Sequence, residues 1–113
     1  MAETCAPATL SYELGCLSDR LWANKVRQGF NTTDFALEIA FLHAEVSEIF
    51  EAWRRGEPVG PEAADALLFL LSVARMAGVD LGAEAVAKMA VNEARQYEQR
   101  PNGLHVQKET ASD

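Results

Sequence analysis

The chain has 113 residues and a formal net charge of −7, and 49% of its residues are apolar. This length fits one domain, and so large an apolar share excludes a disordered chain. The negative charge argues against binding a nucleic-acid polymer, because affinity for phosphate backbones comes mainly from Lys and Arg. No run is long enough to cross a membrane and no signal-peptide pattern opens the chain, so we expect a cytoplasmic protein without membrane contact.

The first half of the chain predicts two helices. The first is expected over residues 9–27, where leucines recur at helical spacing, and Gly29 ends it. The second follows a Thr or Asp cap within residues 32–34 and runs to about Arg55. The segment 56–60, which holds two Gly and one Pro, then breaks the chain.

The second half predicts two more helices. Pro61 suits the first turn of the third helix, because its missing N–H has no intrahelical partner there, and Gly78 ends this helix. The fourth begins at Asp80 or Gly82 and reaches about Tyr97. No strand pattern is visible. The sequence therefore predicts an all-α, four-helix bundle-like fold.

These elements give the domain organisation. We expect a flexible N-terminus over residues 1–8, the all-α domain over residues 9–98, and a polar tail over residues 99–113. Within residues 63–74 of the third helix the only ionisable residue is Asp65, and this segment is apolar on every side. A helix of this kind must be covered all round. We therefore expect a homodimer or a dimer of dimers, with a central helix of a monomeric bundle as the alternative.

Two pairs of carboxylates at i, i+3 spacing mark the second and third helices: Glu45 with Glu48, and Glu62 with Asp65. None has a Lys or Arg three or four residues away on its own helix. Residues three apart differ by about 60° around the axis, so each pair converges on one face, and two packed helices can point all four acids into one pocket. Carboxylates facing a core are costly without a cation. The simplest compensation is a hard divalent ion, Mg²⁺ or Mn²⁺.

Two further features bear on this metal site. Glu38 lies two turns before Glu45 on nearly the same face, and it either supports the site or belongs to the surface. A ferritin-like di-iron centre would require Glu-x-x-His pairs on the helices. His43 and His105 do not complete that motif, so we set this alternative aside.

The order of these motifs resembles the MazG-type all-α nucleotide pyrophosphohydrolases. Besides the two acid pairs, the resemblance rests on the Lys88-x-x-x-Asn92-x-x-Arg95 element of the fourth helix and, more weakly, on Asn24-Lys25 with Gly29-Phe30; it covers residues 22–97. It implies Mg²⁺- or Mn²⁺-dependent hydrolysis of (deoxy)nucleoside triphosphates to monophosphate and pyrophosphate by a homodimer or homotetramer. The implied role is house-cleaning of nucleotide pools.

The resemblance also implies residue roles. The four acids become metal ligands, and Glu45 or Glu48 also orients or deprotonates the attacking water. The phosphate ligands would be Lys88, Asn92, Arg95 and Lys25. Because nucleobases stack on aromatic rings, the candidates for base binding are Trp53, Phe30, Trp22 and Tyr97, each of which also fits ordinary packing.

Departures from the family pattern keep two other functions open. A basic, glycine-rich segment after the last helix is reduced to residues 100–105, and Ala44 and Pro61 stand where the family doubles its acids. One alternative is a phosphoribosyl-nucleotide pyrophosphohydrolase of the same fold. The other is a non-catalytic acidic helical protein that binds a cation or a basic partner.

Overall fold

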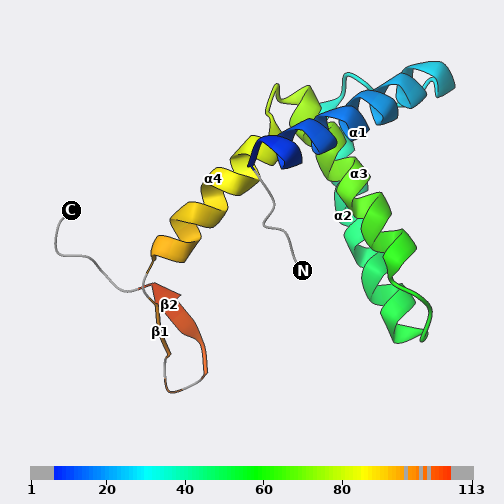
Figure 1. Ribbon diagram of the computed structural model, residues 1–113. Coiled ribbons are helices and arrows are strands. Elements are labelled where there is room, and N and C mark those ends of the chain that lie inside the picture. Colours follow the sequence, from blue (N-terminus) through cyan, green and yellow to red (C-terminus); the bar gives the residue numbers. More distant parts are fainter. Residues whose placement is uncertain (1–6, 96, 100, 102, 108–113) are drawn as a thin grey trace.

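The computed structural model describes residues 7–95, 97–99, 101 and 103–107. Four helices are followed by a short hairpin (Figure 1): α1 (Pro7–Gln28), α2 (Phe35–Arg54), α3 (Gly60–Met76), α4 (Leu81–Ala94), β1 (Tyr97–Gln99) and β2 (His105–Gln107). The predicted all-α class is confirmed, and the four predicted helices each occur within about three residues of their expected ends.

Side-chain caps begin two of the helices where the sequence placed them. The carboxylate of Asp34 accepts a hydrogen bond of 3.0 Å from the Leu37 N–H at the start of α2. The carboxylate of Asp80 accepts one of 3.0 Å from the Ala83 N–H at the start of α4. Each cap satisfies a backbone donor that has no partner within its helix.

The end of α1 positions the ring of Phe30. Gly29 adopts a positive φ of 75°, and the N–H of Phe30 donates to the carbonyl of Lys25 at 2.9 Å. This is the Schellman pattern of a glycine-terminated helix. It turns the chain back so that Phe30 lies beside the last turn of α1.

Helices α2 and α3 form an antiparallel hairpin, and α1 crosses its open end (Figure 1). Inside the hairpin, Phe41 and Phe69 meet edge to face with ring centroids 5.9 Å apart. We call these two residues the aromatic pair. Helix α4 packs mainly on α1 and points away from the hairpin, so the four helices do not close into a bundle within one chain.

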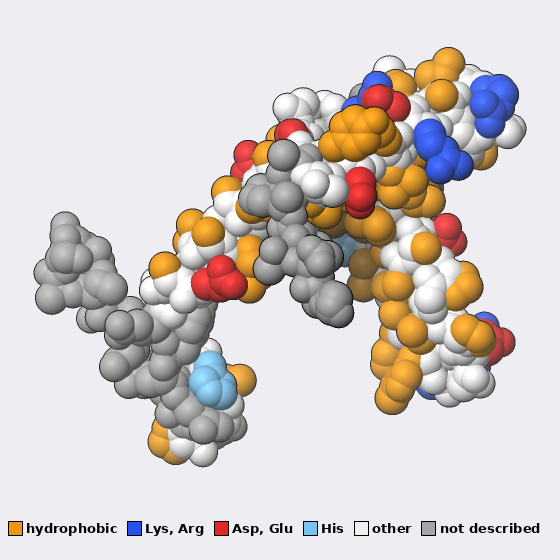
Figure 2. Space-filling model, viewed as in Figure 1, with side chains coloured by type: hydrophobic (Ala, Val, Ile, Leu, Met, Phe, Trp, Pro, Cys, Tyr) orange, Lys and Arg blue, Asp and Glu red, His pale blue; other side chains and the backbone are white. Residues whose placement is uncertain are grey.

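The chain is therefore open. Its Cα radius of gyration is 17.6 Å, against about 13 Å for a compact domain of this length. Its accessible surface is 8457 Å², roughly a third more than the ~6,100 Å² of a compact monomer of its mass. Figure 2 shows hydrophobic side chains at the surface of α4 and of the α2–α3 hairpin. Among the described residues no single helix is long and apolar enough to cross a membrane, and α3 with α4 reaches that measure only as a pair bent by 101°.

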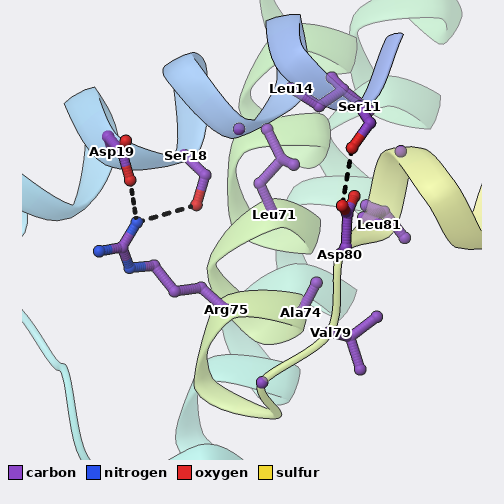
Figure 3. A pocket seen from close by; sticks show the side chains of 13 residues that line it. Ser11, Leu14, Ser18, Asp19, Leu71, Ala74, Arg75, Val79, Asp80 and Leu81 are labelled. Atoms are coloured by element: carbon purple, nitrogen blue, oxygen red, sulfur yellow. Dashed lines mark hydrogen bonds and ion pairs between the residues drawn. The ribbon is translucent and has the colours of Figure 1, made fainter. Parts of the chain in front are cut away.

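Polar contacts hold α1 on the connection between α3 and α4 (Figure 3). The Arg75 guanidinium lies 2.7 Å from the carboxylate of Asp19 and 3.3 Å from the Ser18 hydroxyl, and the Ser11 hydroxyl donates to Asp80 at 2.7 Å. These groups line a cavity of about 350 Å³. Helices α1 and α4 contact each other close to this cavity, and the contact sets the direction in which α4 extends from α1.

The C-terminal region differs from the prediction. Helix α4 ends at Ala94 rather than near Tyr97, and an antiparallel hairpin, with Tyr97 opposite Gln107, occupies part of the predicted tail. Gly103, with a φ of 90°, supplies the left-handed turn. The expectation of no strand was wrong because these strands are only three residues long, and so short a run carries no readable alternation.

Candidate metal and nucleotide site

Three of the four predicted metal ligands converge between α2 and α3. Carboxylate oxygens of Glu45, Glu62 and Asp65 all lie within 4.8 Å of one another. We call these residues the acid cluster. Glu45 and Glu62 are half-buried and Asp65 is exposed, so the cluster faces solvent at one side of the hairpin.

The electrostatics of the acid cluster are unfavourable without a cation. The pKa of Glu45 is raised, first by its partial burial and then by the charges of Asp65, Glu62 and Glu48. Within residues 7–95 no Lys or Arg forms a salt bridge with any of these acids. The arrangement therefore holds carboxylates against their mutual repulsion.

Glu48 stands apart from the cluster. It is exposed one turn beyond Glu45 on α2, and its charge acts on Glu45 without its oxygens joining the close group. The sequence placed all four acids in one pocket, and the structure brings three together with the fourth at the edge. Glu62 and Asp65 have the same spacing and do meet, so the offset of Glu48 reflects how α2 is rotated about its axis against α3.

The donor set fits a hard divalent cation. Such ions take oxygen ligands, and Mg²⁺ or Mn²⁺ commonly binds a few carboxylates while keeping other positions for water and phosphate. Three converging carboxylates, which form no salt bridge to a Lys or Arg of the described residues, satisfy the first requirement. The exposed side satisfies the second, because a phosphate can approach from solvent.

An aromatic cavity adjoins the acid cluster. It consists of two adjacent hollows, of about 170 Å³ and 430 Å³, that share four lining residues. The shared residues are Lys25, Phe30, Glu38 and Phe69. Asp65 lines the smaller hollow, so a ligand in the cavity reaches the acid cluster. Phe30 keeps 57% of its surface exposed and Phe41, in the wall of the larger hollow, keeps 40%.

A buried ion pair lies at the floor of this cavity. The Lys25 Nζ is 2.6 Å from Oε2 of Glu38, whose side chain is 0% exposed, and the Asn31 amide donates to Oε1 of Glu38 at 3.0 Å. The Lys25 Nζ also lies 6.0 Å from the centre of the Phe69 ring, within reach of a cation–π contact. The carboxylate of Glu38 on α2 is thus bonded both to Lys25 of α1 and to Asn31 of the loop that follows α1.

The state of Glu38 follows from its partners. Burial alone would raise its pKa, but hydrogen bonds from Lys25, Ser72 and Asn31 and the charge of Lys25 lower it overall, so the carboxylate is ionised. The Ser72 hydroxyl is close enough to contribute to this effect. Its oxygen, which is buried, nevertheless has no hydrogen bond of normal geometry to the described residues. Ser72 therefore brings an unsatisfied polar atom to the smaller hollow.

Comparisons with known proteins agree with this geometry. No family model matches the chain. A curated relative, the dATP/dGTP diphosphohydrolase of Cyanophage S-2L, is 37% identical over 65 residues, which cover 58% of this chain and only 60% of the relative. Among solved structures, the Cyanophage S-2L MazG-like pyrophosphohydrolase bound to dGDP and three catalytic Mn²⁺ ions per active site is similar, with a TM-score of 0.56, 25% identity, and 94% of this chain and 100% of that chain covered. The chain is thus similar to MazG-type pyrophosphohydrolases in sequence and in fold.

Two of the predicted base-binding aromatics are found in other surroundings than the aromatic cavity. Trp53 is 68% exposed near the far end of α2, beside Phe50 at a centroid distance of 5.9 Å, in an apolar groove. The Trp22 ring is covered by the Arg75 guanidinium at 5.2 Å. Of the predicted set, Phe30 is the one found in the aromatic cavity, while the Tyr97 side chain lies outside the described part of the structure.

The predicted phosphate ligands are divided between two places. Lys25 lies in the aromatic cavity and pairs with Glu38. Lys88 is exposed on α4, and the Arg95 guanidinium donates to the Asn92 side chain at 3.1 Å near the end of the same helix. Because α4 points away from the hairpin, a single chain does not bring this element to its own acid cluster.

Most residues that line the cavity are not predicted by the sequence motifs. For Glu38 the sequence allows either a surface or a supporting position, and the structure buries it completely. Phe41, Phe69 and Ser72 belong to none of the motifs. One signal was available, because on each helix these residues lie on the same face as the metal acids, at spacings of three, four or seven residues.

Proposed function

We propose that this chain is a divalent-metal-dependent nucleotide pyrophosphohydrolase that converts deoxynucleoside triphosphates to monophosphates and pyrophosphate. The carrying observation is the acid cluster, three carboxylates within 4.8 Å of one another that form no salt bridge to a Lys or Arg of the described residues. The aromatic cavity beside it, in which Asp65 borders Phe30 and Phe69, supplies room for a base next to a phosphate site. House-cleaning of nucleotide pools is the proposed role.

The substrate class and the metal take support from the relatives. One is named a dATP/dGTP diphosphohydrolase, and another is a MazG-like pyrophosphohydrolase bound to dGDP and Mn²⁺ ions. We therefore propose purine deoxynucleoside triphosphates as substrates, with Mn²⁺ or Mg²⁺ as the cofactor. The carboxylate ligands fit both ions, so the choice between them rests on measurement.

The chain's own residues have defined tasks in this reaction. Glu45, Glu62 and Asp65 would hold the metal, which when bound neutralises phosphate charge and lowers the pKa of a water ligand. Glu48, which is exposed one turn beyond Glu45, would orient the attacking water and accept its proton. Phe30 and Phe69 would stack on the base and hold the α-phosphorus close to the acids.

A triphosphate panel tests this activity. We expect Mn²⁺- or Mg²⁺-dependent release of pyrophosphate rather than orthophosphate, and its loss in Glu48→Gln and Asp65→Asn. Glu13→Gln, an exposed acid on α1, is the matched control and should retain parental turnover. Turnover that survives both site substitutions would exclude the mechanism, and hydrolysis of phosphoribosyl-ATP alone would move the protein to the biosynthetic alternative.

We also propose that a second copy of the chain completes the site. Leu67 and Leu70 of α3 remain 40% and 39% exposed, as expected if a partner covers this apolar helix. The groove around Phe50 and Trp53 is a further apolar surface, of about 440 Å³. The chain exposes roughly 2,300 Å² more surface than a compact monomer of its mass, which is the scale that an obligate dimer interface removes.

Such a partner would also bring Lys88, Asn92 and Arg95 to the acid cluster of the first chain. Mixing two inactive variants tests this arrangement. Asp65→Asn removes a metal ligand, and Lys88→Met with Arg95→Met removes the basic element. Co-refolded mixtures should recover about a quarter of parental turnover, because half of random pairs are mixed and one site of each mixed pair carries neither change. No recovery, with a dimer intact by light scattering, would place both elements in one chain.

A further inference from the structure

The floor of the aromatic cavity has a chemical asymmetry that the hydrolysis itself does not require. The uncharged rings of Phe30 and Phe69 line both of its hollows, and so do Lys25 and Glu38. The Lys25 side chain keeps 10% exposure, and the buried Ser72 lines the smaller hollow. A flat base stacked on these rings would present its edge to the polar groups.

We propose that Lys25 is a specificity-determining residue that selects a 6-oxopurine, such as guanine, over adenine. The proposal rests on the proposed nucleotide pyrophosphohydrolase function and deepens it. Lysine is a donor without an acceptor, and its common base partner is the O6 and N7 acceptor pair of guanine. Adenine places an amino donor where guanine has O6, so it would face the ammonium donor to donor.

The ion pair prepares Lys25 for this contact. Glu38 Oε2 takes one of the three N–H groups of the ammonium at 2.6 Å, which leaves donors for a ligand. Asn31 holds the other oxygen of Glu38 at 3.0 Å, so the acceptor that orients Lys25 is itself fixed. A fixed donor discriminates more sharply than a mobile one, because the ligand does not bear the cost of ordering it.

The Lys25–Glu38 ion pair disfavours the phosphate-binding role that the family resemblance implies for Lys25. Lys25 and the ionised Glu38 together have no net charge, so they provide no net field that attracts a triphosphate. Asp65, with its carboxylate at the other side of the smaller hollow, adds negative charge. Hydrogen bonding to a neutral base edge remains available, because it depends on the N–H direction rather than on net charge.

Ser72 is a second polar group in the smaller hollow. The residue is 1% exposed, and its hydroxyl lies close enough to Glu38 to help lower the pKa of that carboxylate. A hydroxyl that donates to Glu38 keeps its lone pairs as acceptors for a ligand. A hydroxyl both donates and accepts, so it would complement Lys25 on the edge of the same base.

A base-analogue series on the parent protein tests the contact directly. We would measure kcat/KM with Mn²⁺ for dGTP, dITP, 7-deaza-dGTP and dATP. The expected order is dGTP and dITP about equal, 7-deaza-dGTP lower, and dATP lower than dGTP by about 5- to 150-fold, the discrimination typical of one bidentate base contact. Equal rates for dGTP and dATP, or a preference for dATP, would overturn the assignment.

The variant arm separates base reading from phosphate binding. In Lys25→Met/Glu38→Gln both charges are removed together, so no buried charge is left unpaired. We expect kcat/KM for dGTP and dITP to fall to the dATP level while that for dATP stays within about threefold. Arg20→Met, an exposed cation on α1, is the control. An equal fall for all triphosphates would assign Lys25 to phosphate binding, and unchanged selectivity would exclude it from the base site.

Calorimetry keeps this inference distinct from the proposed hydrolysis. If no triphosphate is turned over with Mn²⁺ or Mg²⁺, the hydrolase proposal fails, but binding of dGMP and dAMP by the parent still tests the cavity. Tighter binding of dGMP would support Lys25 as the base reader, and equal binding would refute it. If the double variant does not fold, as judged by thermal melting, the analogue series on the parent decides.

Discussion

Removing the charge of Lys25 should be one of the most destabilising single changes available in this chain. In Lys25→Met, Glu38 would lose the cation 2.6 Å from its carboxylate while its side chain remains 0% exposed. Breaking a buried pair from one side costs about 3–5 kcal/mol, because the remaining charge is neither solvated nor compensated. Domains of this size have about 5–15 kcal/mol of total stability. The melting temperature should therefore fall by about 10–20 °C.

A double-mutant comparison isolates the cause of this loss. Urea and thermal unfolding, followed by circular dichroism, would be compared for Lys25→Met and for Lys25→Met/Glu38→Gln. The double variant should recover most of the stability, because Gln carries no charge and keeps an acceptor for Asn31. A single variant that loses less than about 1 kcal/mol, or a double variant that is less stable than the single one, would refute the reasoning.

The pH dependence of the parent gives the same test without mutation. The pKa of Glu38 is lowered in the folded state, with the hydrogen bonds from Lys25, Ser72 and Asn31 outweighing the effect of burial. Its contribution to stability is therefore present above the unfolded pKa and is lost as the pH falls through the folded pKa. Lys25→Met should remove this acid-side loss, and a profile that matches the parent below pH 4 would contradict the assignment.

Three further outcomes follow from the structure. The raised pKa of Glu45 adds stability below its unfolded pKa, and this stability is lost as the pH rises through the folded pKa. Glu45→Gln should therefore melt at a higher temperature than the parent at pH 7 in the presence of a chelator. A lower melting temperature would argue against repulsion in the acid cluster. Mn²⁺ binding, measured by calorimetry, should weaken as the pH falls through that pKa because protons compete for the ligand, and pH-independent affinity would place the metal elsewhere. Gly82→Ala would put a Cβ 2.6 Å from the Cα of Ser11 and should cost about 1–3 kcal/mol in urea unfolding, whereas Gly15→Ala, with nothing within 4 Å, should be neutral or stabilising.

The convergence of the acid cluster could be predicted from the sequence because the information is local. Spacing of three residues on a helix fixes which side chains share a face, and the lack of a nearby Lys or Arg leaves the charge uncompensated. Glu45, Glu62 and Asp65 come together as that reasoning requires. The position of Glu48 depends on how far α2 is rotated against α3, which helix periodicity does not specify.

The aromatic cavity was harder to predict from the sequence, because it depends on contacts between elements that are distant along the chain. Lys25 and Glu38 are on different helices, and their pairing requires α1 to cross the open end of the α2–α3 hairpin. The same limit applies to α4, whose direction is set by the close approach of Gly82 to Ser11. Neither crossing leaves a periodic trace in the sequence. Aromatic residues were likewise chosen by type, and of the four only Phe30 is seen to line the cavity.

Three layers of side chains follow one another along the α2–α3 hairpin. The acid cluster comes first and is partly open to solvent. The aromatic pair follows one turn further toward α1, and Glu38 with Ser72 forms a fully buried layer after it. In the proposed reaction, the groups that exchange ligands therefore lie at the solvent side, and the ion pair that orients the base lies inside. Because Lys25 pairs with Glu38 and with none of the three clustered acids, substitutions at Lys25 should change which base is accepted and leave metal affinity unchanged.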